Sequence, residues 1–473
     1  MTRLFLFSRC LLAASLTLSI VTPASLIAQT PKVFDVYELP EIKTVKLDNG
    51  LTLLLLEKHE LPLVSAELAL RSGSVADPTG KEGLGTITAE LLRKGTASRT
   101  ADQFSEESDF IGMNYGDRIA LDSTSVAIDF LKKDTDKAFD LLQDVVLHPA
   151  FPEDEVKKLV AQRQDELRGI KDNPQQVLGA YFTKTLFGEH PYGRPPNGDE
   201  VSVGKITRPD VAAHYAKVFT PGNAVLAVVG DFDSADMEAR VKKLFGAWKG
   251  AAPTPTAIPA MKPVTGKHVL LIDKPDATQT YIAIGNIGLA ADSPDRAPAQ
   301  VVNTLFGGRF TSMFNEELRV KSGLSYGANS RFQYFEQPGP FQMSTFTKNA
   351  TTGAALDKSF EVIATLHSHP FKEEDLTSSK NYLRGTFPPS LETSPQLAHQ
   401  LVVLNIQGLS RKDFNAELAA EQTTTLQEAN RVIDADFPSD NYVLVMIGKT
   451  SEIAPLASKY GAVTTKKISD PGY

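Results

Sequence analysis

The chain has 473 residues, enough for two or more domains that each bury a core of their own. Its hydrophobic fraction of 42% and charged fraction of 22% are those of a soluble globular protein. The formal net charge of −8 argues against nucleic acid or an anionic membrane as a partner.

Residues 1–28 are predicted to be a secretory signal peptide. Arg3 and Arg9 flank its start, an uncharged and mostly apolar run follows, and we expect cleavage after Ala28. The run is too short for a stable transmembrane helix, so we expect no membrane span. Without Arg3 and Arg9, 47 basic residues remain against 57 acidic ones, a balance of −10. Cys10, the only cysteine, leaves with the signal, which predicts a disulfide-free periplasmic protein, with the external medium as the alternative.

The first half begins with a predicted hairpin over residues 44–57, because Asn49 and Gly50 suit a tight turn between two apolar runs. Residues 64–71 alternate apolar and polar side chains as a third strand does. A helical pattern follows over residues 80–96. Later in this half we expect a strand over residues 123–130, helices over residues 134–146 and 152–170, a buried strand over residues 223–230 and a helix over residues 234–245.

Residues 250–266 contain four prolines and no periodicity, which predicts an extended linker between two domains. The pattern then starts again. The dipeptide His148-Pro149 is echoed by His369-Pro370, and the run NAVLAVVG by NYVLVMIG. We therefore predict that residues 267–473 are a diverged copy of residues 29–249.

Residues 307–326, GGRFTSMFNEELRVKSGLSY, contain a predicted helix capped by Thr311 or Ser312 and ended by Gly323. Arg319 and Tyr326 then lie on either side of one helix end, where a guanidinium and a phenol can converge on one group. From the residues alone, the ordinary interpretation is an arginine that complements the helix dipole and a tyrosine that packs on a strand.

Three stretches, residues 83–96, 186–215 and 307–326, together resemble the insulinase/pitrilysin (M16) peptidase family. The resemblance extends from about residue 40 to about residue 460. It implies an α+β fold of two homologous halves with antiparallel-rich sheets, the M16 or LuxS-like metallohydrolase fold. It also implies that the halves form a clamshell around a chamber.

In that family the helix matching residues 83–96 carries H-x-x-E-H, whose histidines bind zinc and whose glutamate is the general base. The motif positions are Thr86, Ala89 and Glu90 here, and the family's third ligand falls near Glu166. Neither H-x-x-E-H nor H-E-x-x-H occurs anywhere in the chain. We therefore expect no zinc in this chain and no peptidase activity from it alone. Glu90 and Glu166 would attract a hard cation only weakly, and two solvated helix acids are the simpler interpretation.

The resemblance is to the non-catalytic chain of a two-chain M16 peptidase, in which the other chain carries H-x-x-E-H and its zinc. It implies that Arg319 and Tyr326 hold a peptide substrate near the scissile carbonyl. We also expect Gly307 and Gly308 to let extended peptide approach the backbone. The repeat offset maps the zinc position of the first half near Gly307 of the second half. The implied substrates are unfolded peptides or small proteins.

Two other functions compete with this one. A non-enzymatic M16-like binding or scaffold protein is the alternative, although a scaffold has no need of both Arg319 and Tyr326. An independent enzyme would need another constellation, and the chain has neither a G-x-S-x-G elbow nor a phosphate-binding G-x-x-x-x-G-K-[ST] loop. The pair His367 and His369 lacks a third ligand, and the repeat explains His369 as a turn residue.

Overall fold

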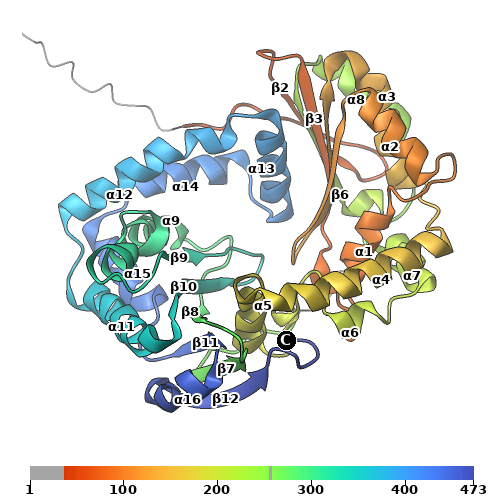
Figure 1. Cartoon of the computed structure of the whole chain (residues 1–473). Helices are drawn as coiled ribbons and strands as arrows, with labels where there is room; N and C mark the ends of the chain where they lie inside the picture. The colour runs from red at the N-terminus through yellow and green to blue at the C-terminus, as the bar shows by residue number, and fades with distance from the viewer. Residues whose placement is uncertain (1–36, 255–257) are drawn as a thin grey trace, which may run out of the picture. The chain divides into compact units, whose positions relative to one another are not determined.

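A computed structural model describes residues 37–254 and 258–473 (Figure 1). The predicted signal peptide and part of the predicted linker lie outside these residues. Each half contains a six-stranded sheet with helices, which confirms the predicted α+β fold of two related halves, and the clamshell around a chamber stays a prediction. Within the described ranges, no helix has both the length and the apolar character needed to cross a membrane.

The first half supplies six strands: β1 (Lys43–Lys46), β2 (Thr52–Glu57), β3 (Leu63–Leu70), β4 (Asn114–Ile119), β5 (Thr124–Leu131) and β6 (Ala224–Gly230). Their order in the sheet is β1-β2-β6-β3-β5-β4, and only β2 and β6 are parallel neighbours. Its helices are α1 (Leu84–Leu91), α2 (Ala101–Phe110), α3 (Thr135–Leu147), α4 (Glu153–Gly169), α5 (Pro174–Phe187), α6 (Glu200–Val203), α7 (Arg208–Val218) and α8 (Ser234–Phe245).

The second half supplies β7 (Lys267–Asp273), β8 (Gln279–Ile287), β9 (Ala328–Phe332), β10 (Pro340–Lys348), β11 (Tyr442–Gly448) and β12 (Ala462–Lys467). Their order is β12-β7-β11-β8-β10-β9, and β7 is parallel to both of its neighbours. Its helices are α9 (Arg296–Asn303), α10 (Met313–Asn315), α11 (Thr352–Ser368), α12 (Glu373–Thr386), α13 (Ser394–Ile406), α14 (Arg411–Thr423), α15 (Leu426–Asp436) and α16 (Thr450–Ala457). Two π-helical segments, η6 (Thr304–Gly308) and η7 (Glu316–Lys321), follow α9 and α10.

The order of elements agrees with the predicted repeat. β6 and β11 are buried along their whole length and occupy corresponding central places in the two sheets. His148 follows α3 and His369 follows α11, so both His-Pro dipeptides come after corresponding helices. The two sheets differ at one edge, because β1 precedes β2 and runs antiparallel to it, whereas β12 follows α16 and runs parallel to β7.

Each half covers one face of the other half's sheet with a helix (Figure 1). α13 of the second half packs on β3 and β6, where Leu401 joins a buried cluster with Val229. α5 of the first half packs on β8 and β11, where Phe182 joins a buried cluster with Val445 and Ile447. The apolar faces of the two sheets are therefore buried by exchange between the halves.

Polar contacts link the same two halves. Asp122, between β4 and β5, accepts hydrogen bonds from the Tyr192 hydroxyl and from the backbone N–H of Glu336, each at 2.9 Å. Glu67, which is buried on β3, lies with Oε1 3.1 Å from Nδ1 of His399 on α13. Since Glu336 and His399 belong to the second half, these bonds fix it against the first half at two separate places.

We predict that truncation of Phe182 destabilises both halves together. Phe182→Ala removes a fully buried ring from the exchanged helix α5, so the free energy of unfolding should fall by ~3–5 kcal/mol. Urea unfolding should still show a single transition, because the lost contacts belong to both halves. The matched control is Phe110→Ala, whose ring is 90% exposed and whose loss should change stability by less than ~0.5 kcal/mol. Two separate transitions, with only one shifted, would contradict the shared core.

Candidate functional site

The helix that matches the zinc-binding helix of the family is α1. It begins after Gly83, which has a positive φ of 93°. The carboxylate of Asp77 accepts the N–H groups of Gly83 and Gly85 at 2.8 and 2.9 Å, which satisfies two of the donors that a helix start leaves free. The sequence thus positions α1 as a well-ordered helix even though its metal ligands are absent.

Two of the three motif positions on α1 have no metal-binding group available. The Thr86 hydroxyl donates a hydrogen bond to the carbonyl of Pro196 at 2.8 Å, and Ala89 is fully buried. Only Glu90 has a side chain that is able to bind a cation.

The cation that Glu90 binds is a guanidinium from α4. Arg163 donates through Nε and Nη2 to the two carboxylate oxygens of Glu90 at 2.9 and 2.5 Å, and through Nη1 to Glu166 Oε2 at 2.5 Å. Burial raises the pKa of Glu90, and the hydrogen bonds from Arg163 oppose that rise. Glu90 and Glu166 therefore share one arginine. They are neither two separate solvated acids nor a vacant site for a hard cation.

These residues do not fit a zinc ion. The donor set consists of two carboxylates that already neutralise Arg163, and it contains no histidine or thiolate. In the described part of the chain, no group of three or more His, Cys, Asp or Glu side chains is placed to hold a metal ion. Arg163 was not predicted from the sequence, although its position three residues before Glu166 on one helix was a signal.

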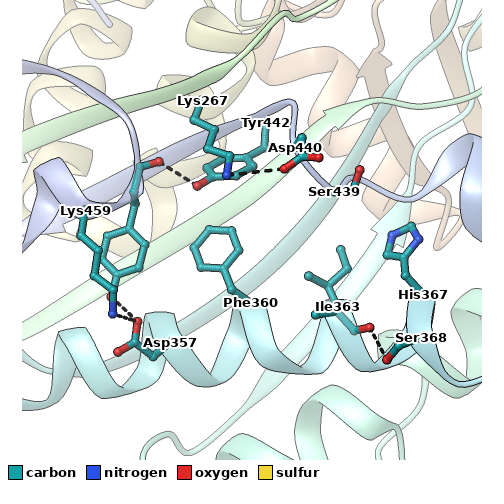
Figure 2. Close-up of a pocket in the computed structure, with 12 residues that line it drawn as sticks. Lys267, Asp357, Phe360, Ile363, His367, Ser368, Ser439, Asp440, Tyr442 and Lys459 are labelled. Atoms are coloured by element: carbon teal, nitrogen blue, oxygen red, sulfur yellow. Dashed lines mark hydrogen bonds and ion pairs between the residues drawn. The ribbon is translucent and has the colours of Figure 1, made fainter.

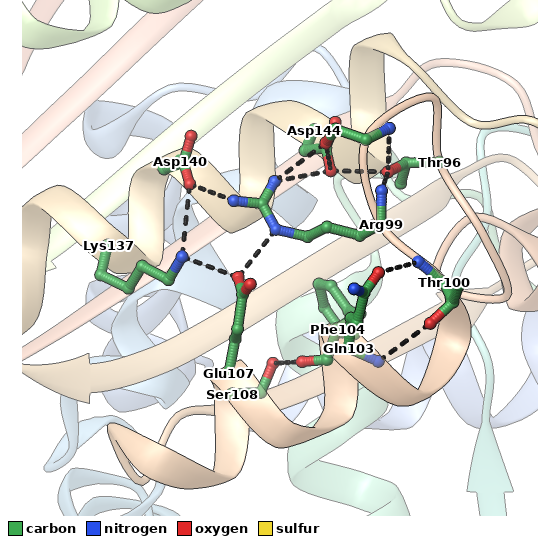
Figure 3. Close-up of polar contacts among 11 residues, drawn as sticks. Thr96, Arg99, Thr100, Gln103, Phe104, Glu107, Ser108, Lys137, Asp140 and Asp144 are labelled. Atoms are coloured by element: carbon green, nitrogen blue, oxygen red, sulfur yellow. Dashed lines mark hydrogen bonds and ion pairs between the residues drawn. The ribbon is translucent and has the colours of Figure 1, made fainter.

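The residues Lys94-Gly95-Thr96, which follow α1, have a structural role (Figure 3). The Thr96 hydroxyl donates to Asp144 Oδ2 on α3 at 2.7 Å, so the loop after α1 is bonded to the next long helix. Arg99 in the same loop donates to Glu107, Asp140 and Asp144 at 2.7, 2.5 and 2.7 Å. This network fixes the end of α1 through charged hydrogen bonds, which are stronger than neutral ones.

In the second half, residues 307–326 fold largely as predicted, with one difference. Ser312 is the N-cap, since its hydroxyl accepts the N–H of Asn315, and Gly323 ends the helical run with a φ of 60°. The run is a short α-helix followed by the π-helical η7, where the sequence predicted one continuous α-helix. The N–H groups of Leu324 and Ser325 both bond to the carbonyl of Leu318, at 2.9 and 3.0 Å. π-helical turns are rare and occur often at functional sites.

Arg319 and Tyr326 come together as the sequence predicted. Arg319 Nη1 donates to the backbone carbonyl of Tyr326 at 2.9 Å, and its guanidinium carbon lies 4.3 Å from the centre of the Tyr326 ring. The Tyr326 side chain is 74% exposed, so its hydroxyl faces solvent and not the protein core. The ring of Phe310, which the sequence analysis did not single out, lies 4.9 Å from the same guanidinium carbon.

Gly307 and Gly308, the first two residues of this segment, have surroundings that differ from the predicted ones. Gly307 is buried, and a Cβ there would come within 2.7 Å of the backbone nitrogen of Ser330 on β9. The close approach that Gly307 permits is therefore to the protein's own strand, while Gly308 is exposed. α9, the helix in the place of α1, continues directly into η6 (Thr304–Gly308), so the mapping of the zinc position near Gly307 stays a prediction.

A cavity of about 560 Å³ lies beside α11 (Figure 2). Its lysines are already paired: Lys459 Nζ lies 2.5 Å from Asp357 and Lys267 Nζ lies 3.6 Å from Asp440. His367 lies on α11 at the cavity, whereas His369 follows the end of the helix, in agreement with its interpretation as a turn residue. We therefore assign no chemistry to this cavity.

Comparison with known families and proteins gives consistent matches. The family model described as "Insulinase (Peptidase family M16)" matches residues 53–200, and the model described as "Peptidase M16 inactive domain" matches residues 205–383. An uncharacterised zinc protease of Mycobacterium leprae is 28% identical over 314 residues, covering 66% of this chain and 70% of that protein. An uncharacterised zinc protease of Rickettsia felis is 26% identical over 341 residues, covering 72% of this chain and 81% of that protein.

Solved structures show the same fold. The crystal structure of a peptidase M16 inactive domain from Pseudomonas fluorescens has a TM-score of 0.81 and 24% identity, over 86% of this chain and 98% of that chain. A protease from Helicobacter pylori has a TM-score of 0.81 and 21% identity, over 87% of this chain and 100% of that chain.

We predict that removing Arg163 destabilises the protein in a pH-dependent way. Arg163→Met keeps an aliphatic side chain but leaves Glu90, whose side chain is 12% exposed, without its cation. The free energy of unfolding should fall by ~1–3 kcal/mol at neutral pH. The loss should shrink as the pH falls through the raised pKa of Glu90, because a protonated carboxyl needs no cation.

Urea unfolding across a pH series measures this effect. Arg168→Met on the same helix is the matched control, since Arg168 is 59% exposed and, within the described ranges, forms an ion pair with Asp165 alone. Adding Glu90→Gln to Arg163→Met should restore much of the lost stability. A double variant as unstable as Arg163→Met would show that the cost does not come from the unpaired carboxylate.

Proposed function

Because the chain belongs to the M16 peptidase family, we propose that it is the non-catalytic, substrate-holding subunit of a two-chain zinc peptidase. The observation that carries the proposal is the contrast between the two halves. In the first half Arg163 pairs with both remaining carboxylates of the motif region, Glu90 and Glu166, while in the second half Arg319 and Tyr326 meet at the surface. Relatives named zinc proteases support peptide cleavage as the reaction that the assembly performs.

The chemistry that this chain supplies is donation to oxygen. Arg319 uses Nη1 on the Tyr326 carbonyl, which leaves the other N–H groups of its fork for a ligand. The Tyr326 hydroxyl is a second donor of similar reach. Together they suit the scissile carbonyl of an extended peptide, whose oxygen gains negative charge when water attacks it. A zinc ion held by H-x-x-E-H in the partner chain would supply the activated water.

The proposal includes a cellular location and a substrate class. The predicted signal peptide supports export to the periplasm, and the acidic balance of the remaining chain supports a peptide substrate over nucleic acid. We expect unfolded peptides or small proteins, because only an extended segment can present its backbone to side-chain donors at a surface.

Reconstitution tests the assembly. The mature chain is purified and assayed on a set of fluorogenic peptides, alone and mixed with a chain of similar length that carries H-x-x-E-H and is encoded beside it. We expect cleavage only in the mixture and loss of cleavage with a chelator. No cleavage in the mixture, with a stable complex formed, would instead support the non-enzymatic scaffold function. Cleavage by the single chain would overturn the assignment of Thr86, Ala89 and Glu90 as a site that has lost its zinc.

We predict that each donor contributes to turnover in the mixture. Arg319→Ala and Tyr326→Phe should each lower kcat by about 10²-fold, the size typical of a lost oxyanion donor, while the complex still forms. Matched controls are Arg168→Ala and Tyr382→Phe, which change exposed side chains outside the Arg319 and Tyr326 pair. Unchanged turnover in both variants would contradict the role of the pair.

A further inference from the structure

Phe310 is the unexplained residue next to the Arg319 and Tyr326 pair. Its side chain is 65% exposed, although it is a large apolar group with the core of the second half nearby. Scattered surface apolar residues are common, but this ring has a defined partner, because it covers the face of the Arg319 guanidinium. Tyr326 lies 4.3 Å from the same guanidinium carbon. We call Phe310 and Tyr326 the aromatic clamp of Arg319.

The backbone around Phe310 is fixed by a buried side chain. Asn315 donates through Nδ2 to the Phe310 carbonyl at 2.7 Å and accepts the N–H of Ala328 through Oδ1 at 3.1 Å. Asn315 is 3% exposed, and it connects the loop that carries Phe310 to the edge strand β9. The ring therefore projects from a held backbone and not from a loose loop.

The other side of the clamp is held from β10. The Thr345 hydroxyl donates to the Gly327 carbonyl at 3.0 Å, and the Thr347 hydroxyl donates to the Leu324 carbonyl at 2.6 Å. These bonds anchor the residues on both sides of Tyr326. Arg319 then closes the arrangement by donating to the Tyr326 carbonyl.

Arg319 differs from Arg163 and Arg99 in the groups that surround its charge. Arg163 and Arg99 both bind carboxylates, whereas the ion pairs among the described residues include none with Arg319. A planar guanidinium stacked on aromatic rings keeps the N–H groups at its edge available for hydrogen bonds. The arrangement orients the cation without using the donors that a ligand would need.

We propose that Phe310 is a positioning residue of the substrate-binding site, which clamps Arg319 against Tyr326 so that the free edge of the guanidinium faces the scissile carbonyl. This inference rests on the proposed function. Phe310 acts through Arg319 and makes no bond to the reacting atoms. Without it, Arg319 remains charged but samples more rotamers, so its bond to the transition state forms less often.

The test compares Phe310→Leu, Phe310→Tyr and Arg319→Ala in the reconstituted peptidase mixture. Phe310→Leu keeps an apolar side chain without a π face, and it should lower kcat about two- to fivefold with little change in KM, the order expected from the loss of one exposed cation–π contact. Phe310→Tyr keeps the ring and should leave turnover close to that of the wild type. The control Phe110→Leu changes an exposed ring in the first half and should leave kcat unchanged.

A double variant separates positioning from direct substrate contact. In an Arg319→Ala background, Phe310→Leu should have no further effect on kcat, because the group that it positions is gone. If instead the two losses multiply, Phe310 contacts substrate by itself and the inference is wrong.

A measurement without substrate separates this inference from the proposed function. In the NMR spectrum of the single chain, ring currents should shift the Arg319 Nε–Hε resonance upfield, and Phe310→Leu should reduce that shift. Turnover that is unaffected by Arg319→Ala and Tyr326→Phe would refute the proposed function, whatever the resonance does. Turnover that depends on Arg319 but not on Phe310, or an Arg319 resonance that Phe310→Leu does not move, would refute the clamp alone.

Discussion

The burial of each sheet by a helix from the opposite half is the interaction on which the rest of the structure depends. α5 leaves the first half to cover β8 and β11, and α13 leaves the second half to cover β3 and β6. Each exchanged helix continues from a helix next to one of the two sites. α4, which carries Arg163, leads into α5, and α12, which packs on η6, leads into α13. The exchange therefore fixes the helices around both places while it completes the two cores.

Arg163 and Arg319 bind different partners, and these partners determine the role of each positive charge. Arg163 binds two carboxylates, and its charge is used inside the protein to stabilise the remains of a motif. Arg319 is covered by two rings and bonded to one carbonyl, which orients its charge without neutralising it. A surface charge without a carboxylate partner loses little solvation and remains available to a ligand. An arginine thus pairs with carboxylates in the first half, whereas in the second half Arg319 bonds to a backbone carbonyl.

Local and repeated patterns in the sequence predicted much of this arrangement. The Asn49-Gly50 turn, the Ser312 cap and the Gly323 stop depend on residues next to one another in the chain, and all three are found in the structure. The missing H-x-x-E-H motif was likewise evident from spacing alone.

Contacts between residues far apart in the sequence were not predictable in the same way. An apolar stripe on α5 or α13 shows that the helix is buried but not which sheet buries it. The contact of Arg163 with Glu90 joins residues 73 positions apart, and the contact of Phe310 with Arg319 joins the loop before α10 to the π-helical η7. Gly307 was predicted to make room for a close approach, but the sequence could not show that β9 of the same chain takes that room.

The edge strands β1 and β12 have a consequence for how one chain can contain the same unit twice. They lie beside β2 and β7, at corresponding edges, but β1 is the first strand of its half and β12 is the last strand of its half. In the second unit, the strand that follows the last helix pairs along this edge. If the first unit were built in the same way, the segment after α8 would have to pair as a strand. Because β1 already occupies the edge, the described residues directly after α8, residues 246–254, form no strand of the first sheet. The different position of the edge strand in the sequence, first in one unit and last in the other, thus leaves the end of the first unit to connect the two units.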